Sequence, residues 1–230
     1  MNLVTGKDDA LIERLKLEGK NSPADILLTA DAGRLYRTKD LGLSQAIESE
    51  TLKAAIPENL RDPENQWFGL TYRARPIFYV KEKIKPIDLS TYADLADPKW
   101  KGKICVRSSD NIYNQSMLAS MIASQGPEAA TQWAEGFVKN LARPPEGGDR
   151  DQLKAAAAGI CDLAIANTYY YGQMLAGDVA EEKAAAEKVA IFWPDQGEQA
   201  RGTHINVSGA TVTKAAKNKD NAVKLLEYLV

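Results

Sequence analysis

This chain of 230 residues contains a single histidine, His204, and only two cysteines, Cys105 and Cys161. One imidazole is too few for the histidine clusters of most zinc and copper centres, and it leaves one candidate for any histidine-dependent catalytic triad. The two cysteines stand far apart, and no Cys-x-x-Cys pair occurs. The sequence therefore excludes a zinc knuckle and a thioredoxin-type redox motif.

The sequence also lacks long hydrophobic runs and an excess of charge of either sign. No apolar stretch approaches the roughly 20 residues of a membrane-spanning helix. The formal net charge is −2, whereas nucleic acids and anionic membranes require a basic face, so we expect neither as a partner and no membrane insertion. Residues 1–4 lead directly into a charged segment without a signal peptide, so we expect that any targeting segment was removed or that the chain is a fragment.

The order of predicted elements indicates an α/β protein with two lobes. Residues 67–80 are rich in β-prone side chains, but Pro76 interrupts them, which predicts a strand that bends or changes partners there. From Lys103 onward, strands and helices alternate. We therefore expect residues 87–202 to form a second lobe, inserted into a discontinuous first lobe of residues 1–86 and 203–230. Two extended crossings would join the lobes, with a ligand cleft between them.

Three consecutive tyrosines, Tyr169, Tyr170 and Tyr171, occupy a predicted junction between a strand and a helix. They follow the apolar strand at residues 163–166. Successive side chains point to opposite faces of a strand and lie about 100° apart on a helix, so three in a row cannot share one buried stripe. At least one ring should therefore point into the space beyond the strand end, where α/β proteins bind ligands.

A second polar turn, at residues 108–114, follows the predicted strand 104–106 and carries Tyr113. If the two strands are parallel, both turns lie at the same edge of the sheet, and Tyr113 approaches the tyrosine cluster. Several phenols without histidine or thiolate suit a hard, highly charged cation that displaces the phenol protons, and ferric iron is the natural candidate. The alternative for each tyrosine is a half-buried ring with a hydrogen-bonded hydroxyl.

Other polar residues leave a choice of roles open. Arg73 and Arg75 face solvent by default, or one of them faces the ligand space and balances phenolates or a bound anion. His204 is by default a polar residue of a crossing strand. Cys105 and Cys161 are either two buried thiols in adjacent strands or a disulfide, which an oxidising compartment would permit.

Several segments, taken together, resemble the periplasmic ferric-iron-binding proteins of ABC transporters, and the cyanobacterial type in particular. The segments are Asn167–Tyr170, Ser108–Ser116, Arg201–Gly209, Ser22–Asp25, Leu95–Lys103 and Gly147–Asp149. The resemblance implies a type II periplasmic binding protein fold and a non-enzymatic, monomeric, periplasmic protein that captures Fe(III) and delivers it to an ABC permease.

The same resemblance assigns roles to single residues. Tyr113, Tyr169 and Tyr170 match the ferric ligands of the family, and Arg73 matches a supporting position behind them. Tyr171 stands where the family usually has an aliphatic residue, so it is expected to pack in the core. The carboxylate ligand of another branch of the family corresponds to Ala30 here.

The resemblance further implies that this chain is truncated at both ends. Family members begin with a strand and helix whose connecting turn carries a His-Tyr pair, and that tyrosine is a further ligand. We therefore expect a first lobe that is incomplete at its N-terminal strand, and weaker Fe(III) binding than in a full-length relative.

Two other interpretations differ in function. One keeps the fold but changes the ligand to a small organic anion or amine, with the tyrosines stacking on it and Arg73 pairing with a carboxylate or phosphate. The other is an enzyme, which has little support because His204 would be its sole base and the sequence has neither a nucleophile elbow nor a phosphate loop.

Overall fold

The computed structural model describes residues 2–230 and divides into two compact units. Unit 1 comprises the chain up to Tyr72 together with Asn206–Val230, and unit 2 is Arg73–Ile205. The sequence predicted the first boundary at residue 86, which is wrong, because the strand at residues 77–80 lies inside the sheet of unit 2. Residues 73–86 and 203–205 therefore belong to unit 2.

Unit 1 is a small α/β assembly. Its elements are α1 (Asp8–Glu18), β1 (Ile26–Ala30), α2 (Ala32–Asp40), α3 (Glu50–Ala55), β2 (Phe68–Ala74), β7 (Ile205–Val212) and α9 (Lys219–Tyr228). The strand order is β1–β7–β2, with β1 antiparallel to β7. A Cβ on Gly209 would stand 2.3 Å from the Phe68 carbonyl oxygen, so the close approach of β7 to β2 requires glycine there.

Unit 2 contains a four-stranded sheet with helices on both faces. Its elements are β3 (Ile77–Val80), β4 (Ile104–Cys105), α4 (Ile112–Gln125), α5 (Pro127–Lys139), α6 (Asp149–Ala157), β5 (Leu163–Ile165), α7 (Thr168–Ala176), α8 (Ala180–Lys188) and β6 (Val189–Phe192). Short 3₁₀ turns also occur. In unit 1 they lie at Gly19–Asn21 and Glu58–Leu60, and in unit 2 at Pro86–Asp88, Ala93–Ala96 and Pro98–Trp100.

The sheet of unit 2 has the strand order β4–β5–β3–β6. β4 and β5 are parallel neighbours, and β3 runs antiparallel to both β5 and β6. The predicted change of partners at Pro76 is confirmed, because β2 ends at Ala74 in one sheet and β3 begins at Ile77 in another.

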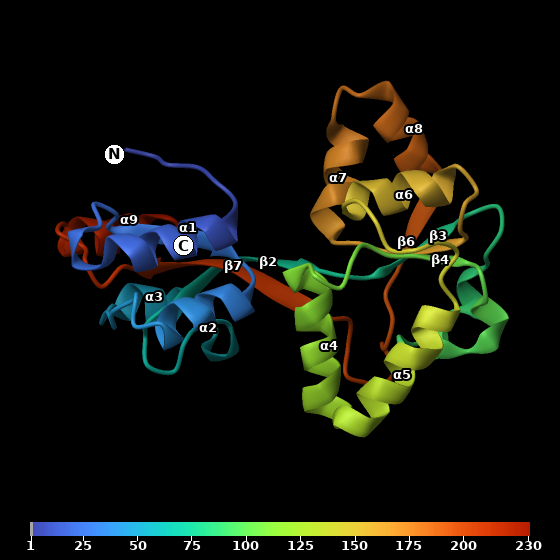
Figure 1. The fold of residues 1–230 in the computed structure, drawn as a ribbon, viewed down its shortest axis with the longest axis horizontal. Coiled ribbons are helices and arrows are strands. Elements are labelled where there is room, and N and C mark those ends of the chain that lie inside the picture. Colours follow the sequence, from blue (N-terminus) through green and yellow to red (C-terminus); the bar gives the residue numbers. More distant parts are fainter. Residues whose placement is uncertain (1) are drawn as a thin grey trace. The chain divides into compact units, whose positions relative to one another are not determined.

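Side chains of β5 point alternately to the two faces of the sheet and contribute to a hydrophobic core on each face. Leu163 and Ile165 pack with Met117 of α4 and Trp133 of α5, whereas Ala164 packs with Leu153 of α6 and with other residues of the opposite face. Figure 1 shows the same division, with α4 and α5 on one face of the sheet and α6, α7 and α8 on the other. Both faces of the strands are thus covered, and the polar groups of the site lie at strand ends. In residues 2–230, no helix is both long and apolar enough to cross a membrane.

A disulfide joins Cys105 and Cys161, whose Cα atoms lie 5.9 Å apart. Both residues are buried. Cys105 ends β4 and Cys161 precedes β5, so the bond links the two parallel strands that lead to Tyr113 and to Tyr169.

The disulfide should stabilise unit 2 by about 4 kcal/mol, because it closes a long loop in the unfolded chain. We expect the double variant Cys105→Ala and Cys161→Ala to lose about that much unfolding free energy in urea titrations. Thiol titration of the unfolded, unreduced protein should find no free thiol, and two free thiols would show that the bond does not form.

Candidate functional site

The tyrosines singled out in the sequence lie in the first turns of two helices. Tyr113 is the second residue of α4, and its N–H donates to Oδ1 of the cap residue Asn111 at 3.0 Å. The predicted junction between strand and helix lies just before the tyrosines, because α7 starts at Thr168 and Tyr169 is its second residue. Because β4 and β5 are parallel, both helices begin at the same edge of the sheet.

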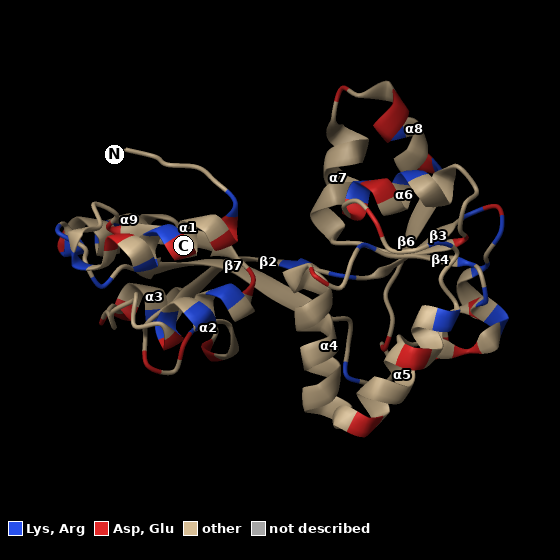
Figure 2. Cartoon of the chain, viewed as in Figure 1, with Lys and Arg blue, Asp and Glu red and all other residues tan. Residues whose placement is uncertain are grey.

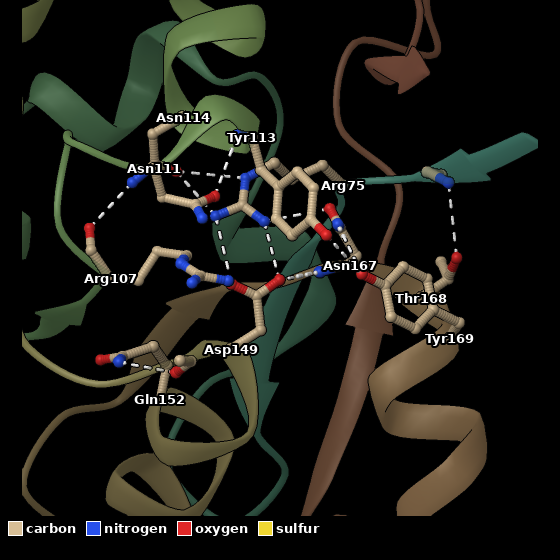
Figure 3. Close-up of polar contacts among 12 residues, drawn as sticks. Arg75, Arg107, Asn111, Tyr113, Asn114, Asp149, Gln152, Asn167, Thr168 and Tyr169 are labelled. Carbon is tan, nitrogen blue, oxygen red and sulfur yellow. Dashed lines mark hydrogen bonds and ion pairs between the residues drawn. The ribbon is translucent and has the colours of Figure 1, made fainter. Parts of the chain in front are cut away.

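The structure brings Tyr113 and Tyr169 together, as predicted from parallel strands. The Tyr169 hydroxyl donates to the Tyr113 hydroxyl at 3.1 Å (Figure 3). The ring of Tyr170 lies 4.3 Å from that of Tyr169, measured between centroids. Tyr171 instead packs against Phe78 at 5.3 Å, which agrees with its assignment to the core.

Burial keeps the phenols of Tyr113 and Tyr169 protonated in the absence of a cation. Burial raises the pKa of Tyr169, and hydrogen bonding with Tyr113 and Tyr170 raises it further. Burial also raises the pKa of Tyr113, against a lowering by the Tyr169 hydrogen bond and by the charge of Arg73. A ligand that requires phenolates must therefore displace protons here.

The positive charge at the site comes from other parts of unit 2. Neither α4 nor α7 contains a charged residue, and both are uniformly tan in Figure 2. The guanidinium carbons of Arg73, Arg75 and Arg107 lie 5.4, 5.9 and 5.3 Å from the ring centroid of Tyr113. Solvent exposure was the default expectation for Arg73 and Arg75, but the two side chains are buried.

Four residues that contribute to the site were not predicted from the sequence: Asn114, Asn167, Arg107 and Asp149. Asp149 is fully buried beside Arg75 and Arg107, and Figure 3 shows its carboxylate between their guanidinium groups. The one available signal was the Gly147-Gly148-Asp149 turn, which combines a flexible backbone with an acid at a helix start.

His204 lies on the segment that returns from unit 2, half-buried. The backbone N–H of His204 donates to the Tyr92 hydroxyl at 3.2 Å, and its backbone carbonyl accepts from the backbone N–H of Arg75 at 3.0 Å. Burial and the charges of Arg201, Arg75 and Arg73 lower its pKa to about 4. The imidazole is therefore neutral at pH 7.

The depressed pKa of His204 makes stability depend on pH. Between pH 6.5 and about 4, the unfolded chain binds a proton at His204 that the folded chain does not. The stability that the neutral imidazole contributes is full above pH 6.5 and falls as the pH is lowered through this window, by up to about 3 kcal/mol. A His204→Gln variant should lose less stability over the window in urea titrations, and parallel curves for the two proteins would contradict this.

The oxygen donors at this sheet edge are phenols rather than the commoner metal ligands. Among residues 2–230, no group of three or more His, Cys, Asp and Glu side chains could hold a metal ion. In unit 2, Asp149 is already engaged by two arginines. The arrangement thus offers neighbouring phenol oxygens at two helix starts, with guanidinium groups close to the rings.

Comparison with known proteins gives a consistent set of relatives. The family described as "Bacterial extracellular solute-binding protein" matches residues 21–230. The chain is 52% identical over 230 residues to "Iron uptake protein A1" of Synechocystis and 50% identical over 229 residues to "Iron uptake protein A2" of the same organism. These alignments cover all of this chain but only 63% and 66% of the two relatives, so it spans less than two thirds of their length.

Two solved structures are similar over nearly the whole chain. A Trichodesmium protein, described as in complex with iron and citrate ligands, is 55% identical with a TM-score of 0.96, and the match covers 99% of this chain and 72% of that one. The apo FutA2 protein of Synechocystis is 50% identical with a TM-score of 0.95 over the same shares.

Proposed function

Since this chain belongs to the family of bacterial extracellular solute-binding proteins, with the predicted type II periplasmic binding protein fold, we propose that it binds ferric iron through the phenolates of Tyr113, Tyr169 and Tyr170. The observation that carries the proposal is the 3.1 Å separation of the Tyr113 and Tyr169 oxygens, with the Tyr170 ring tilted against that of Tyr169, 4.3 Å away between centroids. The family consists of solute-binding proteins and not of enzymes.

The oxygen spacing suits a single small cation. Two oxygens bound at about 2.0 Å and about 90° to each other lie about 2.8 Å apart. The hydrogen-bonded pair is close to that separation, so a cation can replace the shared proton with little movement of either ring.

The charges favour a trivalent cation over a divalent one. Three phenolates would balance the charge of Fe(III), and phenolate is a hard oxygen donor. Tyr113 and Tyr169 must lose their protons against raised pKa values, which requires a strongly charged cation. The positive ends of α4 and α7 stabilise negative charge on their first turns, and Arg73 lowers the pKa of Tyr113.

The names of the relatives support iron as the ligand. The two Synechocystis proteins are iron uptake proteins, and "Major ferric iron-binding protein" of Neisseria meningitidis is 26% identical over 231 residues. By this likeness, the chain acts outside the cytoplasmic membrane, in the periplasm. There, as a monomer, it captures Fe(III) and delivers it to an ABC permease, with Arg73 supporting the phenolates.

Phenolate coordination has a direct spectroscopic test. The chain, loaded with ferric citrate and freed of excess, should show a visible phenolate-to-iron charge-transfer band that disappears on acidification as the phenols reprotonate. The variants Tyr113→Phe, Tyr169→Phe and Tyr170→Phe should each weaken the band.

Tyr171→Phe is the matched control, because it removes a phenol from the same turn whose hydroxyl donates only to the Val189 carbonyl at 3.4 Å. Its band should equal that of the unchanged chain. A colourless protein after loading would refute ferric binding, and a band lost equally in the control would refute the ligand assignment.

A small organic anion or amine is the second candidate ligand, favoured by the three guanidinium groups around Tyr113. A ligand that binds the folded state raises the melting temperature. We expect ferric citrate to raise it more than citrate, phosphate or simple amines without iron. Stabilisation by one of these without iron, and none by iron, would favour the second candidate.

A further inference from the structure

The carboxylate of Asp149 is fully buried, with an exposed fraction of 0%. A buried charge is costly unless it is paired and hydrogen-bonded. Asp149 Oδ2 accepts from Arg75 Nη1 at 2.8 Å and from the backbone N–H of Asn167 at 2.7 Å. Its Oδ1 accepts from Arg107 Nη1 at 3.4 Å. One carboxylate thus contacts the segment between β2 and β3, the loop after β4 and the residue before α7.

Arg75 is held as firmly as its partner. Its Nε and Nη2 donate to Asn114 Oδ1 at 3.2 and 2.7 Å, and its Nη1 donates to Asn167 Oδ1 at 3.0 Å. Its carbonyl accepts from the Tyr92 hydroxyl at 2.7 Å. Every nitrogen of the guanidinium therefore has an acceptor, and the side chain has a single well-determined position.

The two asparagines bonded by Arg75 lie next to the two tyrosines. Asn114 follows Tyr113 in the first turn of α4, and its Nδ2 donates to the Arg107 carbonyl at 2.8 Å. Asn167 precedes α7, and its Nδ2 lies 3.5 Å from the Tyr169 hydroxyl. In Figure 3 the guanidinium of Arg75 lies between these side chains. Hydrogen bonds through Asn114 and Asn167 thus connect both tyrosines to the same arginine, Arg75.

The turn before α6 places Asp149 in this arrangement. Gly147 has a φ of 66°, and a Cβ there would stand 2.6 Å from Asp151 Oδ2. The Gly148 N–H donates to the same oxygen at 2.7 Å, and Gln152 Nε2 donates to the Glu146 and Gly148 carbonyls at 2.6 and 2.9 Å. These hydrogen bonds stabilise the conformation of the glycine turn that directs Asp149 toward Arg75.

We propose that Arg75 and Asp149 are positioning residues that hold the first turns of α4 and α7 so that the Tyr113 and Tyr169 oxygens lie close enough to bind one metal ion. The inference rests on the proposed ferric function. The proposed role is not stabilisation of the fold, because replacing both partners of a buried ion pair by apolar residues is often neutral for stability. What the forked hydrogen bonds supply is the spacing of the phenols.

The test compares variants that keep the charge with variants that remove it. Arg75→Lys keeps a cation but loses the forked hydrogen bonds, Arg75→Met removes both, and Asp149→Asn removes the carboxylate charge with almost no change in size. We expect each variant to bind Fe(III) at least about tenfold more weakly in competition with citrate. The charge-transfer band of the remaining complex should shift in wavelength.

Asn114→Ser guards against loss of folding, because it leaves the ion pair and removes only the Asn114 amide, which accepts from Arg75 and donates to the Arg107 carbonyl. It should also weaken binding and shift the band. Asp162→Asn is the matched control, since it breaks the Lys83–Asp162 pair, 2.8 Å long, elsewhere in unit 2. This control should keep the affinity and the band of the unchanged chain.

Crystal structures of the iron-free variants separate this inference from the proposed function. The Tyr113–Tyr169 oxygen distance should exceed hydrogen-bonding range in Arg75→Lys and Asn114→Ser, whether or not the unchanged chain binds iron. An unchanged chain without a visible band refutes the ferric function, while the distances still test the positioning. The positioning role is overturned if Arg75→Lys binds Fe(III) as tightly as the unchanged chain. It is also overturned if the Tyr113–Tyr169 oxygen distance is unchanged in both variants.

Discussion

The charge of Asp149 has no access to solvent, and the arrangement of unit 2 around the tyrosines depends on how that charge is balanced. The partners are a buried arginine between β2 and β3, a second arginine after β4, and a backbone N–H before α7. Removing any one of them would leave a buried polar group unpaired, which costs more than the pair itself contributes. The network therefore fixes the relative positions of three chain segments.

The parallel pairing of β4 with β5 determines which residues meet above this network. Each strand ends at the same edge and is followed by a helix whose first turn carries a tyrosine. The disulfide joins the same two strands from within the core. Burial then raises the pKa of Tyr113 and Tyr169, while the helix N-termini and, at Tyr113, the charge of Arg73 favour the anion, so the proposed binding of a cation there requires a strong positive charge.

Local patterns in the sequence were sufficient to predict part of the fold and part of the candidate site. Pro76 predicted the division of the strand, and the two polar turns predicted the meeting of Tyr113 with Tyr169. The burial of Arg75 was not predictable, because a charged residue beside a proline in a β-prone stretch reads as solvent-facing until its partners are known. Those partners, Asn114 and Asp149, are distant in sequence, and no local pattern connects them to it.

The lobe boundary was misplaced for a related reason. Residues 77–80 continue the β-prone stretch that contains β2, yet they pair with strands that come much later in the chain. Pairing partners depend on long-range contacts, so the sequence indicated the break at Pro76 without indicating which sheet each half joins.

Iron located in the crystal tests the central claim most directly. Crystals soaked in ferric citrate, with anomalous scattering measured at the iron absorption edge, would give the position of the metal. The account predicts an iron peak about 2 Å from the phenol oxygens of Tyr113, Tyr169 and Tyr170. An iron peak bound elsewhere in the chain, with the Tyr113 and Tyr169 hydroxyls still hydrogen-bonded to each other, would contradict it.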